Sequence, residues 1–173
     1  MGKQSEDLVW VIGAEGLLGR AWLSWCKENG ISTVATGREL DLSAQSDLDH
    51  FLGTLSRIPT YVVNCAAMTG YDRCEKDPDR AFEVNAEGPA LLGQLANKYC
   101  FHLIHYSSDV VFEGIRGHRT ETSLTGPLSV YGKSKLAGEK SLQEHCPAAL
   151  IIRTSWLLGH HRMNFVLRIL AGM

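Results

Sequence analysis

The sequence has few of the features that mark membrane, secreted or nucleic-acid-binding proteins. No apolar run approaches the roughly 18–20 residues that span a bilayer. The polar start, Met1–Asp7, is unlike a signal peptide. The 17 Lys and Arg residues are balanced by 19 Asp and Glu residues and form no basic block, which disfavours a general nucleic-acid binder. We therefore expect a cytoplasmic protein with no membrane or nucleic-acid partner.

Disulfide and metal-binding patterns are also lacking. The five cysteines are odd in number and scattered, with no C-x-x-C pair, so we expect reduced thiols rather than a disulfide framework or a zinc site. The adjacent His160 and His161 have no carboxylate or cysteine near them in the sequence. We interpret them as loop residues, and we predict no metal site.

Alternation of strand-like and helical patterns dominates what is present. Apolar runs that predict strands lie at 8–13, 31–36, 61–65, 101–106 and 148–154. Helical patterns lie between and after them, at 17–29, 43–55, 79–99, 130–145 and 165–171. This order predicts an α/β fold, a Rossmann-type doubly wound parallel sheet with helices on both faces, formed by one domain over 1–173. Ligands of such sheets bind beyond the carboxyl ends of the strands.

A glycine-rich loop joins the first predicted strand to the first predicted helix. Its G-x-x-G-x-x-G pattern lets the backbone turn tightly and approach a pyrophosphate, while the helix N-terminus offers free N–H groups. A glycine-rich turn without a ligand is the alternative, but the position between a buried strand and an amphipathic helix favours a dinucleotide site. The expected cofactor contacts of the loop are Gly13, Glu15, Gly16, Leu17, Leu18 and Gly19.

The end of the second predicted strand bears on the choice of cofactor. Arg38 stands where an NAD enzyme usually offers an acidic residue to the ribose hydroxyls, and a guanidinium there suits the 2′-phosphate of NADPH. Glu39 is adjacent, so NADH stays possible, and a surface arginine without a ligand is a further alternative.

A Y-x-x-x-K pattern places Tyr131 and Lys135 on one face of a predicted helix. A cation beside the phenol is expected to lower the tyrosine pKa, so that Tyr131 can give its proton to a carbonyl oxygen as hydride arrives at the carbon. Ser108 closes the fourth predicted strand, where its hydroxyl can hydrogen-bond a developing oxyanion. Alone, two adjacent serines after a strand are ordinary turn residues.

Taken together, these segments resemble an extended short-chain dehydrogenase and, within that group, the dTDP-4-dehydrorhamnose reductase family. The resemblance runs from Leu8 to about Gly159. It rests on VIGAEGLLG (11–19), GRELDLS (37–43), VVNCAAMTGYDRCEKDP (62–78), AFEVNAEGP (81–89), HYSSDVVFEG (105–114), PLSVYGKSKLAGE (127–139) and IIRTSWLLG (151–159).

The resemblance implies an NAD(P)H-dependent reduction of the C4 keto group of a nucleotide-linked deoxysugar, with a homodimer possible. It implies catalysis by Ser108, Tyr131 and Lys135, the last two also contacting the cofactor. Further implied cofactor contacts are Asp41 and Leu42 at the adenine end and Asn64, Cys65, Ala66 and Ala67 across the third strand. The implied substrate contacts are Thr69, Asp109 and Trp156.

Two departures from the family pattern accompany the resemblance. Val110 stands where the family commonly has a tyrosine, which removes one hydroxyl from the implied sugar pocket. The family continues for about another hundred residues that build a sugar-nucleotide lobe, which this chain lacks, so we expect it to bind cofactor better than substrate. A second hypothesis is a non-catalytic NADP-binding regulatory subunit resembling the β subunit of methionine adenosyltransferase.

Overall fold

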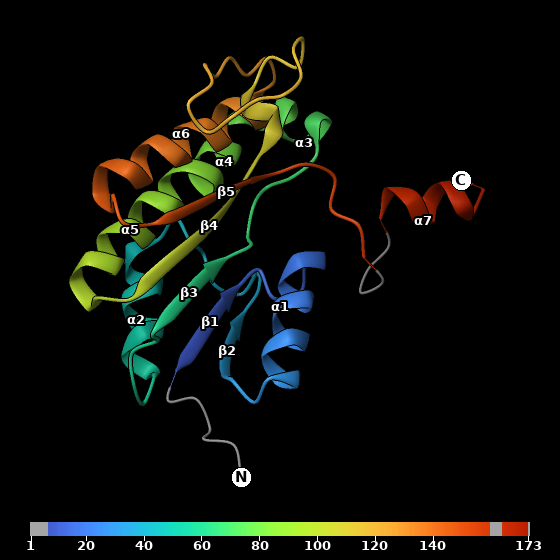
Figure 1. Ribbon diagram of the computed structural model, residues 1–173. Helices are drawn as coiled ribbons and strands as arrows, with labels where there is room; N and C mark the ends of the chain where they lie inside the picture. Colours follow the sequence, from blue (N-terminus) through green and yellow to red (C-terminus); the bar gives the residue numbers. More distant parts are fainter. Residues whose placement is uncertain (1–6, 160–163, 173) are drawn as a thin grey trace.

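The sheet of this protein is fully parallel and has five strands (Figure 1). A computed structural model describes residues 7–159 and 164–172, so that Met1–Glu6 and the pair His160 and His161 lie outside the described residues. The strands stand in the order β2-β1-β3-β4-β5, and they are β1 (Leu8–Ile12), β2 (Ser32–Thr36), β3 (Tyr61–Asn64), β4 (His102–Ser108) and β5 (Leu150–Thr154). The predicted doubly wound α/β fold is confirmed.

Helices cover both faces of the sheet. In Figure 1, α1 lies on one face and α2, α5 and α6 on the other. The helices are α1 (Leu17–Glu28), α2 (Gln45–Thr54), α3 (Tyr71–Lys76), α4 (Pro78–Phe82), α5 (Gly88–Tyr99), α6 (Val130–His145) and α7 (Phe165–Leu170). A short 3₁₀ turn, Asp109–Val111, follows β4. No helix in the described ranges is long and apolar enough to cross a membrane.

Alternate residues of the strands enter two separate cores. Trp10 and Val62 face α2, α5 and α6, and they pack in a cluster with Leu48, Leu92 and Leu142. Val9, Val11 and Val63 face the opposite way and pack against Cys26 and Trp22 of α1. Strand β1 is buried along its whole length, which explains its unbroken apolar run.

The winding of the chain reverses between β1 and β3. Strand β2 lies on one side of β1 and strand β3 on the other, so the connections that leave the carboxyl ends of β1 and β3 diverge. Such a reversal opens a crevice beyond the strand ends, which is where doubly wound sheets bind ligands. The predicted functional residues follow these same strand ends.

Two helical regions differ from the sequence-based expectation. The helix predicted over 79–99 is divided, because a π-helical segment, Glu83–Glu87, separates α4 from α5. Its residue Asn85 is buried, and its side chain hydrogen-bonds the backbone of Met68 and the hydroxyl of Ser134. Helix α3 was not predicted, since its six residues carry too short a pattern to show helical periodicity.

Candidate functional site

The glycine loop between β1 and α1 is held in a compact turn. Its first two amides donate to the carbonyl of Thr36 at the end of β2, and Gly16 N donates to Gly13 O at 3.0 Å. Gly13 has φ +75°, and a Cβ there would lie 2.7 Å from the backbone nitrogen of Ala66. A Cβ on Gly19 would lie 2.3 Å from Gly13 O, so this glycine lets α1 pack against the loop. The N-terminus of α1 is therefore directed at the space beyond β1.

Arg38 and Glu39, the two residues after β2 that could contact the ribose of the cofactor, lie differently with respect to the cleft. Arg38 lines the cleft beyond the strand ends, whereas Glu39 turns back and accepts a hydrogen bond from Gly37 N at 2.6 Å. That backbone contact holds the pKa of the Glu39 carboxyl below its usual value. The arginine, and not the carboxylate, faces the cleft.

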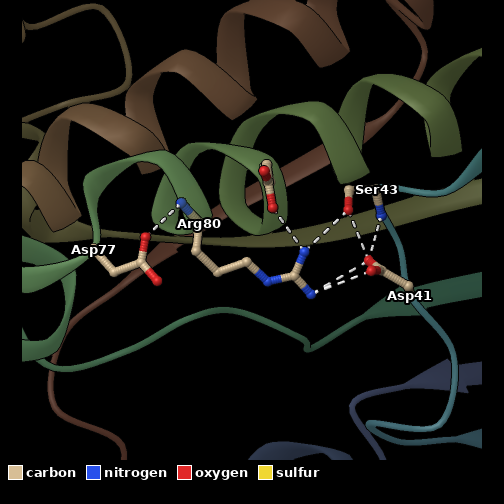
Figure 2. A network of polar contacts seen from close by, with 5 residues as sticks. Asp41, Ser43, Asp77 and Arg80 are labelled. Atoms are coloured by element: carbon tan, nitrogen blue, oxygen red, sulfur yellow. Dashed lines mark hydrogen bonds and ion pairs between the residues drawn. The ribbon is translucent and has the colours of Figure 1, made fainter.

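Asp41, which also lines the cleft, is part of a charged network that joins the β2–α2 connection to α4 (Figure 2). Asp41 accepts hydrogen bonds from the amide and the hydroxyl of Ser43, which lower the pKa of its carboxyl, and the guanidinium of Arg80 adds to this effect. Arg80 also pairs with Glu83 at 2.8 Å, while Asp77 caps α4 by accepting from Arg80 N. The Asp41 carboxylate is thus engaged by protein donors, which leaves its backbone and the neighbouring Leu42 to shape this end of the cleft.

The segment after β3 is clamped by hydrogen bonds from two sides. Asn64 is buried at the end of β3, and its Oδ1 accepts from Ala66 N at 3.0 Å. Asn85 holds the other end, since its Oδ1 accepts from Met68 N at 2.8 Å and its Nδ2 donates to Met68 O at 3.0 Å. The intervening residues, Cys65 to Ala67, line the cleft.

The hydroxyls of Ser108 and Tyr131 meet where β4 and α6 approach the cleft. Ser129 caps α6 by accepting from Gly132 N, which places Tyr131 in the first turn. Burial raises the pKa of Tyr131 above its usual value, and a hydrogen bond with Ser108 acts in the opposite direction. The raised pKa differs from the sequence-based expectation, in which Lys135 lowers the pKa of Tyr131.

The amine of Lys135 explains that difference. Lys135 is buried, and its Nζ donates to the carbonyl of Tyr106 at 2.7 Å and lies 3.4 Å from His105 Nε2. Burial lowers the pKa of Lys135 to about 8, and the nearby Glu139 acts against this. The ammonium is therefore directed at β4 and not at the phenol of Tyr131.

These features converge on one cleft of about 1170 Å³ at the carboxyl ends of the strands. Most of the predicted site residues line it, namely Gly13, Glu15, Gly16, Leu17, Leu18, Arg38, Asp41, Leu42, Cys65, Ala66, Ala67, Thr69, Ser108, Tyr131 and Lys135. Four predicted residues do not: Gly19 packs α1, Asn64 shapes the turn after β3, Asp109 lines a smaller cavity, and Trp156 is 70% exposed beyond β5.

Several residues of the site escaped the sequence-based prediction. Arg80, Asn85 and His105 hold cleft residues through hydrogen bonds that join distant parts of the chain. Asn85 and His105 lie in segments that carry the family resemblance, so the motif was visible although the role was not. Ser107 also lines the cleft, and its buried hydroxyl has no partner within the described ranges. A buried hydroxyl of this kind is expected to meet a ligand or water.

A comparison with known families identifies the chain. Residues 8–172 match the family described as RmlD substrate binding domain. The chain belongs to the RmlD family. This confirms the resemblance drawn from the motifs, and the match covers nearly all of the sequence.

Several relatives of this RmlD-family chain are named dTDP-4-dehydrorhamnose reductase. It is 35% identical over 159 residues to a dTDP-4-dehydrorhamnose reductase of Aggregatibacter actinomycetemcomitans, covering 90% of this chain and 53% of that protein. It is 37% identical over 163 residues to one of Streptomyces griseus, covering 92% of this chain and 53% of that protein. The chain thus spans about half the length of these relatives.

Solved structures agree with this assignment. A dTDP-4-dehydrorhamnose reductase from Clostridium acetobutylicum is similar with a TM-score of 0.87 at 32% identity, covering 95% of this chain and 58% of that one. One from Bacillus anthracis, solved in complex with NADP, gives a TM-score of 0.88 at 29% identity, covering 95% of this chain and 59% of that one.

Proposed function

We propose that this chain is the cofactor-binding part of an NADPH-dependent reductase that acts on a nucleotide-linked 4-keto-deoxysugar. The observation that carries the proposal is the convergence of the glycine loop, Arg38 and the Ser108–Tyr131–Lys135 group on one cleft. The names of the relatives support the substrate class, and the neighbour solved with NADP supports the cofactor.

The cleft residues fit a dinucleotide. The close backbone approach at Gly13 and the N-terminus of α1 suit a pyrophosphate. The Ser107 hydroxyl, which has no partner among the described residues, offers a polar contact further along the cleft. Arg38 would pair with the 2′-phosphate through charge-assisted hydrogen bonds. NADPH, when bound, supplies the hydride for the reduction.

Side chains of β4 and α6 would donate the proton that the reduction requires and stabilise the charges that develop. Tyr131 donates the proton of its hydroxyl to the carbonyl oxygen of the substrate as the carbon receives hydride, which leaves an alcohol and a tyrosinate. Ser108 hydrogen-bonds the same oxygen and stabilises the charge that develops on it. The protonated form of Lys135 stabilises the tyrosinate by its positive charge until the tyrosinate regains a proton from solvent.

The cofactor assignment is tested by calorimetric titration of the chain with NADPH and with NADH. We expect NADPH to bind more tightly, and Arg38→Ala to weaken NADPH binding by about 1–3 kcal/mol while leaving NADH nearly unaffected, because only one charge-assisted contact is lost. Arg57→Ala is the matched control, since Arg57 is exposed and precedes β3 at the opposite end of the sheet. Equal affinities for the two cofactors, unchanged by Arg38→Ala, would remove Arg38 from this role.

A purely regulatory NADP-binding subunit is the competing hypothesis. The presence of Ser108, Tyr131 and Lys135 at one cleft favours an enzyme, because binding alone does not need a proton donor there. Turnover of a dTDP-linked 4-keto-sugar by a protein that carries this chain within the full family length separates the two hypotheses.

A further inference from the structure

A buried chain of polar groups runs behind the cleft from β3 through β4 to α6. Asn64, His105 and Lys135 are each buried to 1% exposure. Asn64 Nδ2 lies 3.1 Å from His105 Nδ1, and His105 Nε2 lies 3.4 Å from Lys135 Nζ. The proposed reaction uses only Lys135 among these three residues.

The orientation of Asn64 determines which nitrogen of His105 carries the proton. Asn64 Oδ1 is occupied by the amide of Ala66, so that the Nδ2 donor faces His105. His105 Nδ1 must accept this hydrogen bond, and a neutral imidazole with an accepting Nδ1 carries its proton on Nε2. Burial, together with the charge of Lys135, holds the pKa of His105 well below its usual value, which keeps the ring neutral.

The proton on His105 Nε2 affects which protonation state of Lys135 is favoured. An ammonium has only donors, so an N–H group directed at it forms no hydrogen bond, whereas a neutral amine has a lone pair that accepts one. The second partner of the amine, the carbonyl of Tyr106, accepts from either form. The imidazole of His105 therefore favours the neutral amine over the ammonium.

Other groups that face Lys135 act in both directions. Glu139 lies one turn further along α6 and favours the ammonium, but its carboxylate already binds Arg153 through two hydrogen bonds. Burial raises the pKa of the Cys65 thiol to about 12, so it offers no negative charge near neutral pH. Tyr131, on the preceding turn of α6, is likewise a neutral phenol. Within the described chain, the balance of these groups leaves the amine close to its titration point.

We propose that His105, oriented by Asn64, is a positioning residue that keeps Lys135 ready to gain or lose a proton, so that an anionic dinucleotide entering the cleft draws a proton from solvent onto the lysine. The catalytic meaning of this step rests on the proposed function, because the ammonium is the form that stabilises the anion of Tyr131. Ligand binding and the charging of Lys135 are then one coupled event.

The tautomer of His105 is the first test and needs no variant. Two-dimensional ¹⁵N NMR of the histidine rings in this chain should show His105 neutral, with the proton on Nε2, from about pH 6 to pH 9. Disappearance of the signal in His105→Gln assigns it. A proton on Nδ1, or a protonated ring, would overturn the proposal.

The second test follows the titration of Lys135 by ¹³C NMR of chains labelled at the lysine Cε positions. The Lys135→Met variant identifies the Lys135 signal by its disappearance. His105→Gln places an amide oxygen where the Nε2–H was, and we expect the titration of Lys135 to move upward by about one pH unit or more. His102→Gln is the matched control on the same strand, because His102 is exposed and stacks on Tyr61; it should leave Lys135 unchanged.

Asn64→Asp gives an independent variant, since a carboxylate accepts from Nδ1–H and turns Nε2 into an acceptor for the ammonium. It should move the titration of Lys135 in the same upward direction. Folded variants in which Lys135 titrates as in the unmodified chain would overturn the proposal. Because neither NMR measurement requires turnover, a protein that behaves as expected here but reduces no 4-keto-sugar would contradict only the proposed function.

Discussion

Tyr131 is held in the protonated form that a proton donor requires. Its phenol is largely buried, which raises its pKa, and its ring forms a T-shaped pair with the ring of Tyr71, with the centroids 6.0 Å apart. Among the residues that the structure describes, the Ser108 hydroxyl alone opposes the effect of burial on this pKa, by stabilising the anion. In the proposed reaction Tyr131 would therefore enter as a phenol, and a positive charge would have to be present when it becomes a tyrosinate.

Replacing Tyr131 by phenylalanine tests this role in a protein of full family length. Tyr131→Phe should lower kcat by about 10²-fold or more, because the proton donor acts only in the transition state. NADPH affinity should stay nearly unchanged, since the ring remains. Stopped-flow turnover and cofactor titration on the same preparation measure both quantities, and Tyr71→Phe serves as the control. Full turnover by Tyr131→Phe would place the acid elsewhere.

Lys135 should make stability depend on pH in a defined window. Its pKa is about 8 in the folded chain and about 10.5 in an unfolded one. Between these values the unfolded chain binds more protons, so raising the pH favours the folded state. The free energy of unfolding of the unmodified chain should therefore rise relative to Lys135→Met by about 3 kcal/mol from pH 8 to pH 10.5.

Urea denaturation of both proteins at pH 7, 8, 9 and 10 measures this difference, because the other titrating groups cancel in the comparison. Below about pH 7 the difference should be constant, since the lysine is then protonated in both states. A difference that stays flat up to pH 10 would mean that the folded chain does not depress the pKa of Lys135.

At the scale of elements, two helical glycines should respond to the same substitution with opposite signs. A Cβ on Gly138 of α6 would lie 2.1 Å from the carbonyl oxygen of Asn85, whereas a Cβ on Gly53 of α2 meets nothing within 4 Å. Gly138→Ala should lower the free energy of unfolding by about 1–3 kcal/mol through this clash. Gly53→Ala should raise it by up to about 1 kcal/mol, because alanine is the better helix former.

Thermal or urea unfolding of the two variants measures these changes in the free energy of unfolding, and both variants make the same glycine-to-alanine change within a helix. Gly138→Ala should also weaken NADPH binding, since it displaces Asn85, which clamps the segment after β3. A Gly138→Ala protein as stable as Gly53→Ala would show that the contact between α6 and the π-helical segment can relax without cost.

The strands and most helices were predictable because their patterns are local. The buried run of β1 and the amphipathic spacing of α1 can be read from a few neighbouring residues. The π-helical segment was not predictable, since the hydrogen bonds of Asn85 join it to residues 17 and 49 positions away. Tertiary contacts of this kind leave no periodic signal in the sequence.

The same distinction applies to the candidate site. Residues at or just after strand ends, such as Ser108 and Arg38, were predicted because the carboxyl edge of a parallel sheet is where ligands bind. The hydrogen-bond partners of Lys135 were not predicted. Spacing along α6 placed the lysine amine beside Tyr131, whereas in the structure the buried amine is directed at His105 and the Tyr106 carbonyl. Spacing indicates which residues share a helix face, but it does not indicate which atoms meet.

Considered as a whole, the molecule holds most of the predicted cofactor residues in one cleft but places the three predicted substrate residues apart from one another. Thr69 lines the cleft, but Asp109 lines a separate cavity and Trp156 is 70% exposed. Leu157 and Leu158, which follow it, are also exposed. Water therefore has access to the side of the cleft where the sugar would lie, and each hydrogen bond to the substrate carbonyl contributes less there.

We accordingly expect this 173-residue chain to bind NADPH measurably. It should reduce dTDP-linked 4-keto-sugars at less than about 1% of the rate of a full-length relative, because reactants that are poorly positioned and hydrated lose most of the benefit of proximity. A fluorescence titration with NADPH and a steady-state assay on the same preparation measure both quantities, with the full-length enzyme assayed beside it. Loss of NADPH binding in Gly13→Val would confirm that the titration reports the cleft, since a side chain at Gly13 meets the backbone of Ala66. Rapid reduction by the chain alone would show that the predicted substrate residues that follow β3, β4 and β5 are enough to hold the sugar nucleotide for hydride transfer.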